Sequence, residues 1–530
     1  TGTVTFTEGD PVAPIDKDTI TLLDENGQPA AAVFAKSPAG DIIGTFTVDK
    51  ETGVVTFTPT DKSYSGDVVP VKVQAADTNG TTVETTYTPK ITPVVPTSED
   101  ATTTDIQGAT QTGKPVFTEG DSRVPMNDDV PATFDDGSTT KSVDGVGTYT
   151  VAADGTVTFV PEPSFTGTAP AVTVVREDKN GTKASATYTP SVTPITVTPT
   201  DKVSADVQNV PQTQTPTFDL SNDKTAEITS KKLVDPATGQ PTDETTVTVA
   251  GEGSYTIDPT TGAVTFTPEK DFVGTAKGVT VQATATITNA NGKTATITSD
   301  ATYTPTVVAA VPTAQPATSK DIQGATQTGT PTFAGTTVQV NGEDKAITIK
   351  DNSYTLLDND GNEVTSTPAY AADGTTEIGT YSIDSATGQV TFTPTDKSYT
   401  GVVTPAKVQA ESSNGIKVDT TYTPEIVPVT PTATPAETKD IQGATQTGKP
   451  EFKGGTVTVD GVEKTVEINE DVPATFDDGS TTKTVDGVGT YTVAADGTVT
   501  FVPEKSFVGT APAVTVVRED KNGTKASEDR

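Results

Sequence analysis

Residues 71–89 read VKVQAADTNGTTVETTYTP, in which apolar or β-branched residues alternate with polar ones on both sides of an Asn-Gly pair. Alternation with a period of two places one face of an extended chain inward and the other outward, and Val, Thr and Tyr suit such a surface. Asn-Gly tolerates positive φ at both central positions of a tight type I′ turn. The stretch therefore predicts two antiparallel strands joined by a hairpin turn.

A second kind of hairpin precedes the first along the chain. It is predicted by GTFTVDKETGVVTFTP at Gly44–Pro59 and by GTYTVAADGTVTFVP at Gly147–Pro161, with DKETG and Asp-Gly as the turns. Helical spacing of apolar residues is nearly absent. Short strands separated by turns every 8–12 residues are typical of two packed sheets, so we expect an all-β, Ig-like β-sandwich fold.

The same order of motifs occurs five times. The Phe of the VTFTP or VTFVP motif recurs at intervals of 102, 107, 126 and 109 residues. Each copy continues with an aromatic residue two positions before a Gly, an alternating run and an Asn-Gly pair, and the first four end in YTP. A period near 100 is the length of a whole small domain, not of a solenoid unit. The conserved Phe residues are Phe57, Phe159, Phe266, Phe392 and Phe501.

We therefore predict five tandem domains arranged as an elongated rod. Repeats 1 to 5 are placed at residues 1–96, 97–198, 199–311, 312–430 and 431–530. Repeats 1, 3 and 4 carry longer front halves, whereas repeats 2 and 5 are expected to be compact. The first begins inside its motif and the fifth is expected to lack its last strand, leaving an exposed sheet edge, so the sequence is interpreted as an excerpt of a longer chain.

Two features favour a structural role for the copies. Residues 127–185 and 469–527 differ at only four positions, which indicates recent duplication. DIQGATQTG motifs, preceded by Pro-rich tracts such as KITPVVPT, are interpreted as joints between repeats. The tracts are expected to be semi-rigid spacers, or edge strands that run from one repeat into the next. The motifs lie at Thr103–Pro115, Ser319–Pro331 and Thr438–Pro450.

Composition excludes several functions. The chain has no Cys and no His, which removes disulfides, Cys-ligated metals and the commonest general base. Its net charge of −36 argues against nucleic acid and anionic membranes as partners. No stretch of 18 apolar residues predicts a membrane span, and neither a signal peptide nor a sorting signal is present. Because Leu, Ile, Val and Phe make up only about a fifth of the residues, a disordered Thr-rich stalk is an alternative that the alternating pattern opposes.

Candidate sites are few. A calcium loop is suggested by Asp24–Gln28, Asp358–Glu363 and Asp135–Thr140, but each lacks the ligand set of a calcium site and a hairpin turn is favoured. The carboxylate pairs Asp135-Asp136 and Asp477-Asp478 are interpreted as solvated turn residues. We therefore assign no catalytic, cofactor or metal site, expect no enzymatic activity, and leave any binding residues unknown.

Several other residues have both a functional interpretation and a purely structural one. Lys72 and Lys407 lie on predicted strands where an intramolecular isopeptide bond would form, yet Thr replaces them in the other repeats. Residues Arg176–Lys179 are interpreted as a solvated, charged strand end. Asn-Gly-Thr at Asn79, Asn180 and Asn522 matches a glycosylation acceptor, but the turn already explains it.

Taken together, the ordered VTF(T/V)P, aromatic-x-Gly, Asn-Gly, YTP and DIQGATQTG motifs resemble the CshA-type fibril repeats of Gram-positive, chiefly streptococcal, surface adhesins. The resemblance covers essentially the whole chain. It implies an extracellular stalk that carries an adhesive head and is anchored covalently to the cell wall by a sorting signal, both outside this sequence. It also implies host matrix proteins such as fibronectin, or other bacteria, as partners of the head.

Two functions follow as hypotheses. In the first, the chain is the stalk of a surface fibril, a monomeric rod on the order of 150–200 Å long if each repeat spans about ten residues of strand. In the alternative, the repeats themselves bind a host glycoprotein or pack laterally against copies of themselves, and repetition supplies avidity. A shared exposed aromatic patch would favour the alternative, and the repeated aromatics instead lie in the strand pattern.

Overall fold

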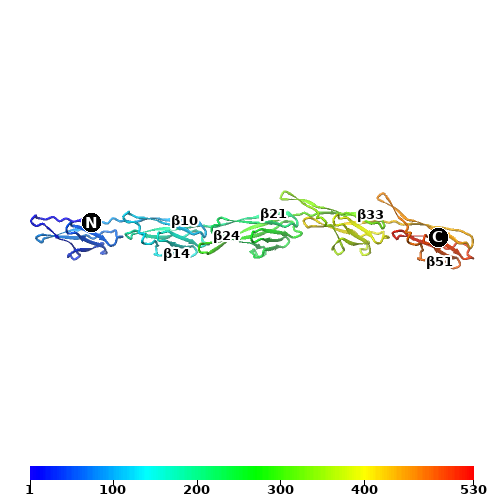
Figure 1. The fold of residues 1–530 in the computed structure, drawn as a ribbon, viewed down its shortest axis with the longest axis horizontal. Helices are drawn as coiled ribbons and strands as arrows, with labels where there is room; N and C mark the ends of the chain where they lie inside the picture. Colours follow the sequence, from blue (N-terminus) through cyan, green and yellow to red (C-terminus); the bar gives the residue numbers. More distant parts are fainter. Residues whose placement is uncertain (530) are drawn as a thin grey trace.

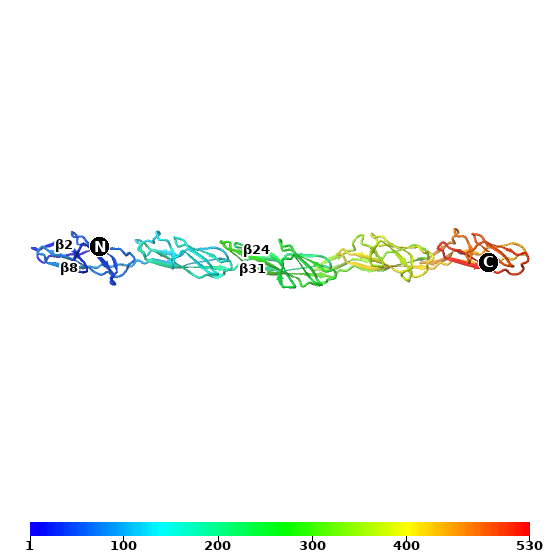
Figure 2. The same ribbon diagram turned by 90° about the horizontal axis from the view of Figure 1, so that it is seen from below.

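The computed structural model describes residues 1–529, which form five β-domains in single file along a rod (Figures 1 and 2). The described residues contain strands and turns and no helix. The prediction of an all-β, Ig-like repeat protein is therefore confirmed, and the disordered alternative is not what the structure shows.

Repeat 2 shows the plan of each domain. One sheet has the order β10-β19-β18-β13, with β17 beside β19, and the other has the order β11-β16-β15-β14. Two short strands, β9 and β12, form a ribbon where the chain enters. These strands are β9 (Thr97–Glu99), β10 (Ala101–Ile106), β11 (Gln111–Gly113), β12 (Val116–Thr118), β13 (Thr133–Phe134), β14 (Thr140–Val143), β15 (Gly147–Val151), β16 (Val157–Pro161), β17 (Gly167–Thr168), β18 (Val172–Glu177) and β19 (Lys183–Thr193).

The other repeats follow the same plan. Repeat 1 has β1 (Gly2–Thr3), β2 (Ile15–Leu23), β3 (Pro29–Ala30), β4 (Ala32–Lys36), β5 (Ile42–Val48), β6 (Val54–Pro59), β7 (Val71–Asp77) and β8 (Thr82–Tyr87). Repeat 3 has β20 (Val197–Thr200), β21 (Lys202–Val207), β22 (Gln212–Gln214), β23 (Thr217–Leu220), β24 (Ala226–Asp235), β25 (Gln240–Pro241), β26 (Thr246–Val249), β27 (Gly253–Ile257), β28 (Val264–Pro268), β29 (Gly274–Thr275), β30 (Val279–Thr288) and β31 (Thr294–Val308).

Repeats 4 and 5 complete the rod. Repeat 4 has β32 (Thr313–Gln315), β33 (Ala317–Ile322), β34 (Gln327–Gly329), β35 (Thr332–Ala334), β36 (Thr336–Val340), β37 (Glu343–Ile347), β38 (Thr355–Leu357), β39 (Glu363–Val364), β40 (Ser366–Tyr370), β41 (Glu377–Ile383), β42 (Val390–Pro394), β43 (Ala406–Glu411) and β44 (Lys417–Val427). Repeat 5 has β45 (Thr432–Thr434), β46 (Gln446–Gly448), β47 (Glu451–Lys453), β48 (Gly455–Val459), β49 (Val462–Val466), β50 (Thr475–Phe476), β51 (Thr482–Val485), β52 (Gly489–Val493), β53 (Val499–Pro503), β54 (Thr515–Glu519) and β55 (Lys525–Asp529).

The hairpin of the VTF motif supplies the core. In repeat 2, Tyr149 of β15 pairs with Phe159 of β16, their ring centroids are 4.7 Å apart, and both side chains are fully buried. Val174 of β18 and Tyr188 of β19 cover them from the other sheet. Burying a large apolar side chain contributes about 1.5–3 kcal/mol, so this cluster is the main source of stability within the repeat.

The Asn-Gly turn differs from the predicted type. Gly80 has φ of +87°, but Asn79 is not among the residues with positive φ. The Gly80 N–H donates to Asp77 O at 2.9 Å and the Asp77 N–H to Thr81 O at 3.0 Å, which makes a three-residue loop that ends in a left-handed glycine. The type I′ prediction is therefore wrong here, because the loop has one residue more than a type I′ hairpin allows.

True type I′ turns occur in two hairpins that the sequence analysis missed. Asn341-Gly342 joins β36 to β37 and Asp460-Gly461 joins β48 to β49, with positive φ at all four residues. Repeat 5 therefore shares a front hairpin with repeat 4, and the prediction that it is compact like repeat 2 is wrong in its front half. Asn-Gly and Asp-Gly between alternating residues were the available signal.

The DIQGATQTG motif is not a linker between repeats but belongs to the beginning of the domains in which it occurs. In repeat 2 it forms β10, a turn and β11, and these two strands lie at the edges of different sheets. β10 pairs in parallel with β19, the last strand of the same repeat. The Pro-rich tracts after repeats 2 and 4 begin as a continuation of the last strand, as the edge-strand alternative expected, because β19 runs on to Thr193 and β44 to Val427, whereas KITPVVPT lies beyond the end of β8 at Tyr87.

The last strand of repeat 5 is partly present, contrary to the prediction that it is missing. β55 pairs with β54 and corresponds to the beginning of β19, because the residues before YTP and YTP itself form one continuous strand in the other repeats. The expectation failed because it treated the YTP motif as a strand of its own.

Candidate functional site at the joints between repeats

The sequence-predicted site residues lie apart from one another. Asp24 and Asp358 sit in hairpin turns, where each carboxylate accepts two backbone N–H groups of its own loop. The backbone hydrogen bond from Asn362 is the largest cause that holds the pKa of Asp358 below its ordinary value. Asp135 and Asp477 pair with Lys141 and Lys483 on the same hairpins. These contacts are those of turn residues.

The two lysines considered for an isopeptide bond are on the surface. The Lys72 side chain is 60% exposed and lies 3.4 Å from Glu84 on the neighbouring strand, and Lys407 is exposed as well. An isopeptide bond would require a buried lysine beside its acceptor, and neither lysine is placed that way.

The charged strand end of repeat 2 is less solvated than expected. The Arg176 side chain is only 11% exposed and donates to Asp128 at 2.7 Å. Asp178 is fully buried and its Oδ1 accepts the N–H groups of Asn180 and Thr182. The prediction of a solvated edge is wrong for these two residues, because residues 125–128 run alongside this strand end and bond to it.

A buried glutamine organises the far end of repeats 2 and 4. Gln107, from the DIQG motif, is 4% exposed; its Nε2 donates to Pro163 O at 2.8 Å and its Oε1 accepts the Ile195 N–H at 3.1 Å. Gln323 in repeat 4 makes the same pair of bonds, to Ser398 O and from the Val429 N–H. The glutamine thus ties three segments together where the chain leaves the repeat, and sequence reasoning gave it no role.

The Asn-Gly turn of the following repeat fits against this end. Between repeats 3 and 4, the Asn414 side chain is 6% exposed and its Nδ2 donates to Gln208 O and Ala310 O, each at 3.0 Å. In the opposite direction across the joint, the Asn209 Nδ2 donates to Asn414 O at 2.9 Å. The Asn-Gly motif therefore forms a hairpin turn and also inserts its Asn side chain into the end of the preceding repeat.

The other described joints use related bonds. Between repeats 4 and 5, the Asn522 Nδ2 donates to Gln323 O at 2.6 Å. Between repeats 2 and 3, Asn289 donates to Pro161 O at 2.9 Å, and the Thr225 hydroxyl donates to Gln107 O at 2.6 Å. Within residues 1–529, no side-chain hydrogen bond or ion pair joins repeats 1 and 2.

Hairpins in the front halves of repeats 4 and 5 contact the preceding repeat at two of the joints. The β36–β37 and β48–β49 hairpins reach back over the end of the preceding repeat (Figure 1). Val340 and Ile347 of the first hairpin pack on Val207 and Ala310 of repeat 3 in a small apolar cluster. At the joint between repeats 2 and 3, the long β24, β30 and β31 extend the sheet instead, and Ile287 packs on Ile195.

An ion pair recurs at these three joints. The Asp of the DIQ or DVQ motif receives a lysine from the next repeat in each case. The pairs are Lys224–Asp105 at 2.8 Å, Lys345–Asp206 at 3.0 Å and Lys464–Asp321 at 2.5 Å. The lysines come from a loop, from β37 and from β49, so the same contact is made from different elements. Each carboxylate is 20–30% exposed, which leaves the pairs partly shielded from salt.

The joint between repeats 2 and 3 should respond to acid. Burial acts to raise the pKa of Asp105, but hydrogen bonds from Lys224 and from the Ile106 N–H outweigh it and hold the pKa below its ordinary value of 3.8. A carboxylate with a lowered pKa stabilises the folded contact above its unfolded pKa, and this contribution is lost as the pH falls through the folded value. We therefore expect the joint to loosen below about pH 4.

Labels on repeats 2 and 3 would measure this response, since the chain has no Cys to interfere with labelling at introduced cysteines. The distance distribution between them should broaden in acid, and Lys224→Ala should broaden it already at neutral pH. Lys114→Ala is the matched control, because it removes an ion pair with Asp154 inside repeat 2 at the same distance of 2.8 Å. Equal broadening by both variants would contradict a specific role for Lys224.

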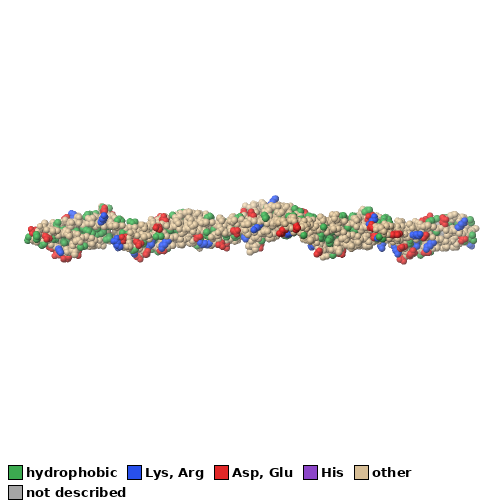
Figure 3. Space-filling model, turned by 90° about the horizontal axis from the view of Figure 1, so that it is seen from above, with side chains coloured by type: hydrophobic (Ala, Val, Ile, Leu, Met, Phe, Trp, Pro, Cys, Tyr) green, Lys and Arg blue, Asp and Glu red, His purple; other side chains and the backbone are tan. Residues whose placement is uncertain are grey.

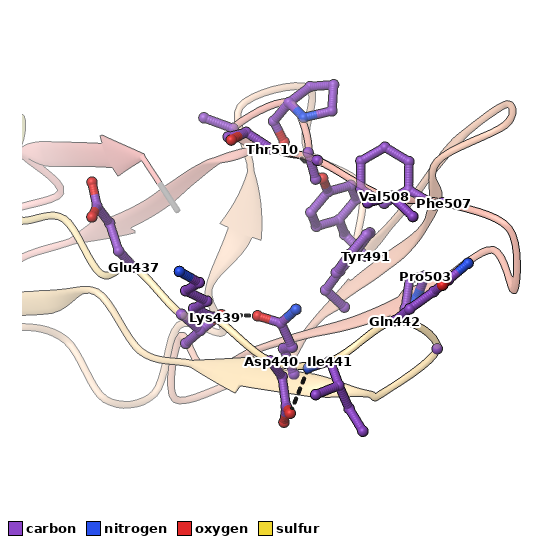
Figure 4. Close-up of a pocket in the computed structure, with 18 of the residues that line it drawn as sticks. Glu437, Lys439, Asp440, Ile441, Gln442, Tyr491, Pro503, Phe507, Val508 and Thr510 are labelled. Atoms are coloured by element: carbon purple, nitrogen blue, oxygen red, sulfur yellow. Dashed lines mark hydrogen bonds between the residues drawn. The ribbon is translucent and has the colours of Figure 1, made fainter.

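Repeat 5 has an open groove of about 830 Å³ where the other repeats hold the remainder of their last strand. Tyr491, Phe507 and Val508 lie on one side and the segment 437–442 on the other (Figure 4). In repeat 2 the same place is filled by Tyr188 and Val192 of β19. Residues 436–441 form no strand here, whereas the equivalent residues 101–106 form β10, because the parallel partner strand is what orders them.

Replacing residues 528–530 by the ATYTPSVT of residues 186–193 should fill this groove. Burial of one Tyr and one Val is expected to stabilise repeat 5 by about 3–5 kcal/mol. Calorimetry should show one transition moving to higher temperature, and the same extension with Tyr replaced by Ala should recover much less. An unchanged transition would show that the groove does not take this strand.

On the face seen in Figure 3, charge is spread along the rod rather than concentrated at a site. Acidic and basic side chains are scattered along the face seen in Figure 3, and neither sign dominates one stretch of it. Among residues 1–529 no three His, Cys, Asp or Glu side chains gather as metal ligands would. No helix of the described residues is long and apolar enough to cross a membrane.

The family model for the surface adhesin CshA repetitive domain matches residues 1–91, 93–192, 194–307, 309–426 and 428–529. The chain belongs to the CshA repeat family. The recurring joint contacts are thus contacts between consecutive CshA repeats, and the family places the chain in a surface adhesin, outside the cell or at its surface. Family and fold are those of a non-enzymatic structural protein.

Solved structures that match these CshA repeats include two at low sequence identity. The human desmocollin-1 ectodomain is 14% identical, with a TM-score of 0.20 over 95% of this chain and 92% of that one. The I9–I11 tandem of titin is 11% identical, with a TM-score of 0.26 over 63% of this chain and 97% of that one. No curated protein gives a significant match.

Proposed function

We propose that the five CshA repeats are the stiff stalk of a surface fibril, which holds an adhesive head away from the cell wall. The observation that carries the proposal is the joint. Side-chain hydrogen bonds and an Asp–Lys ion pair connect each of repeats 2, 3 and 4 to the repeat that follows it, and an apolar contact is added at the two joints of repeat 3. Such contacts fix the angle between neighbouring domains, which a flexible linker would not do.

The surface supports a spacer better than a binding module. With a net charge of −36, neighbouring stalks repel each other, and less so at high salt. The tyrosines of the hairpin that carries the VTF motif are buried, and Tyr149, Tyr255 and Tyr381 are at most 2% exposed, whereas the aromatic of the aromatic-x-Gly motif is half-buried in every repeat. Anchoring through a cell-wall sorting signal, and a head that binds a host matrix protein such as fibronectin or other bacteria, belong to the same proposal and rest on the family.

A length-rescue experiment separates the stalk from the alternative. The chain would be attached to a bead at one end and fused at the other end to a binding domain whose ligand is known. A grafted polymer layer would cover the bead surface. Reducing five repeats to two should abolish capture of ligand-coated particles, and an unrelated rigid spacer as long as five repeats should restore it. Rescue by the authentic repeats alone, or capture of host glycoproteins by the chain without a head, would favour the binding module and overturn the stalk.

A further inference from the structure

We propose that the parallel pair formed by the first and last strands of a repeat is the force-bearing clamp of this fibril. The inference rests on the proposed function, because a stalk that holds a cell to a surface carries tension along its length. It adds which interactions set the resistance of a repeat to that tension.

The topology determines how the clamp is loaded. In repeat 2, tension first meets the short β9–β12 ribbon, then enters the two main sheets at the beginning of β10 and leaves at the end of β19. These strands are parallel neighbours, from the pair Ala101 and Tyr188 to the pair Ile106 and Thr193. Pulling the beginning of one strand and the end of the other in opposite directions makes them slide along each other. The evenly spaced hydrogen bonds of a parallel ladder are then loaded together, instead of one after another as in a hairpin that is peeled open.

A buried hydroxyl network locks the two strands at one register. The Tyr188 hydroxyl of β19 lies 2.7 Å from the Thr103 hydroxyl of β10, and Thr103 donates to Gln111 Oε1 at 2.5 Å. Gln111 of β11 completes the bridge, because its Nε2 donates to Ser191 O at 2.9 Å. The tyrosine ring also covers Gly113, where a Cβ would lie 2.2 Å from a ring carbon. Sliding of β10 against β19 separates Thr103 from Tyr188 and from Gln111, which is itself bound to β19 through Ser191.

The same lock occurs in repeats 3 and 4, which like repeat 2 contain the parallel pair of strands. Repeat 3 uses Ser204, Tyr303 and Gln212, and repeat 4 uses Ser319, Tyr422 and Gln327. The parallel register is also the same, since each lead strand begins opposite the tyrosine. The hydroxyl residue changes between Thr and Ser while the network is kept, which indicates that the bridge itself is the shared feature.

Repeats 2 and 4 offer a matched control. Tyr149 and Tyr381 are buried like Tyr188 and Tyr422, and each also makes one hydroxyl hydrogen bond of 2.7 Å, to Pro170 O or Thr404 O. These bonds do not involve the first or last strand. Tyr188→Phe with Tyr422→Phe removes two clamp hydroxyls, and Tyr149→Phe with Tyr381→Phe removes two hydroxyls elsewhere. All four rings remain, so both double variants should fold.

The test is single-molecule force spectroscopy of the whole chain held at its two ends. At constant force the clamp variant should unfold two of its repeats ~10-fold faster, as expected for losing a buried hydrogen bond that the transition state has broken. The control variant should unfold at the wild-type rate, because its bonds are intact when the clamp yields. Calorimetry should show similar thermal destabilisation of both.

The outcomes separate this inference from the function on which it rests. Equal acceleration by the two variants, or none by the clamp variant, would overturn the clamp while leaving a stiff stalk in place. A flexible chain in solution would instead overturn the stalk, whatever the unfolding rates.

Discussion

Phe159→Ala is expected to lower the free energy of unfolding of repeat 2 by about 3–5 kcal/mol, because it removes a fully buried ring from the centre of the core. Phe159 contacts Tyr149 across the hairpin, and neighbouring strands of both sheets surround it. For a domain of about 100 residues, such a change moves the melting temperature by more than ~10 °C.

Calorimetry of the whole chain would measure this effect as one transition shifting while most of the heat absorption stays in place. The control is Phe34→Ala, which removes the same ring from a position 61% exposed in repeat 1 and should change little. Movement of every transition together would show that the five repeats unfold as one unit, contrary to the account of separate domains.

Asn414→Ala is expected to uncouple repeats 3 and 4. The substitution leaves Gln208 O and Ala310 O without their donor in a buried joint, which costs about 1–3 kcal/mol. Labels on the two repeats should show a broader distance distribution, and repeat 4 should lose part of its stability. The comparison is Asn180→Ala, the same turn position in repeat 2, whose side chain makes no hydrogen bond across the joint within residues 1–529.

Equal effects of the two asparagine substitutions would mean that the turn itself, and not the contact with the preceding repeat, accounts for the loss. The measurement therefore distinguishes the two roles that the structure gives to the Asn-Gly motif.

Local patterns in the sequence predicted the local parts of the fold. The alternation around Gly147–Pro161 gives the β15–β16 hairpin with Tyr149 and Phe159 inward, because strand period and turn length are determined by neighbouring residues. The period of the VTF motif gives the five domains. The type of the Asn-Gly turn was not predicted correctly, because a loop of three residues instead of two changes it. The Asn-Gly pair alone does not reveal the length of the loop.

Long-range parts could not be predicted in the same way. TTDIQGATQTG is polar and glycine-containing, so it resembles a connection, yet it supplies two strands whose partners lie about 50 to 90 residues further on. The burial of Gln107 and Arg176 likewise depends on segments that are distant in the sequence and cover these side chains. The joint forms between two repeats. The sequence of a motif within one repeat does not indicate which surface of the neighbouring repeat it will contact.

The front hairpins were predictable and were missed. VNGE at residues 340–343 and VDGV at residues 459–462 carry the type I′ signal between alternating residues. Their effect on the joint could not be read from that signal, because it depends on Ile347 and Lys345 reaching Val207 and Asp206 of another repeat.

Small-angle X-ray scattering of the whole chain, beside a variant that carries Asn414→Ala and lacks the tip of the β36–β37 hairpin, tests the central claim most directly. For joints that fix five repeats of roughly 40 Å in line, the wild-type chain should scatter as a rod about 200 Å long. The variant should show a bend or a spread of shapes at one joint. A wild-type profile typical of a flexible string of beads, indistinguishable from that of the variant, would contradict the account of a stiff stalk.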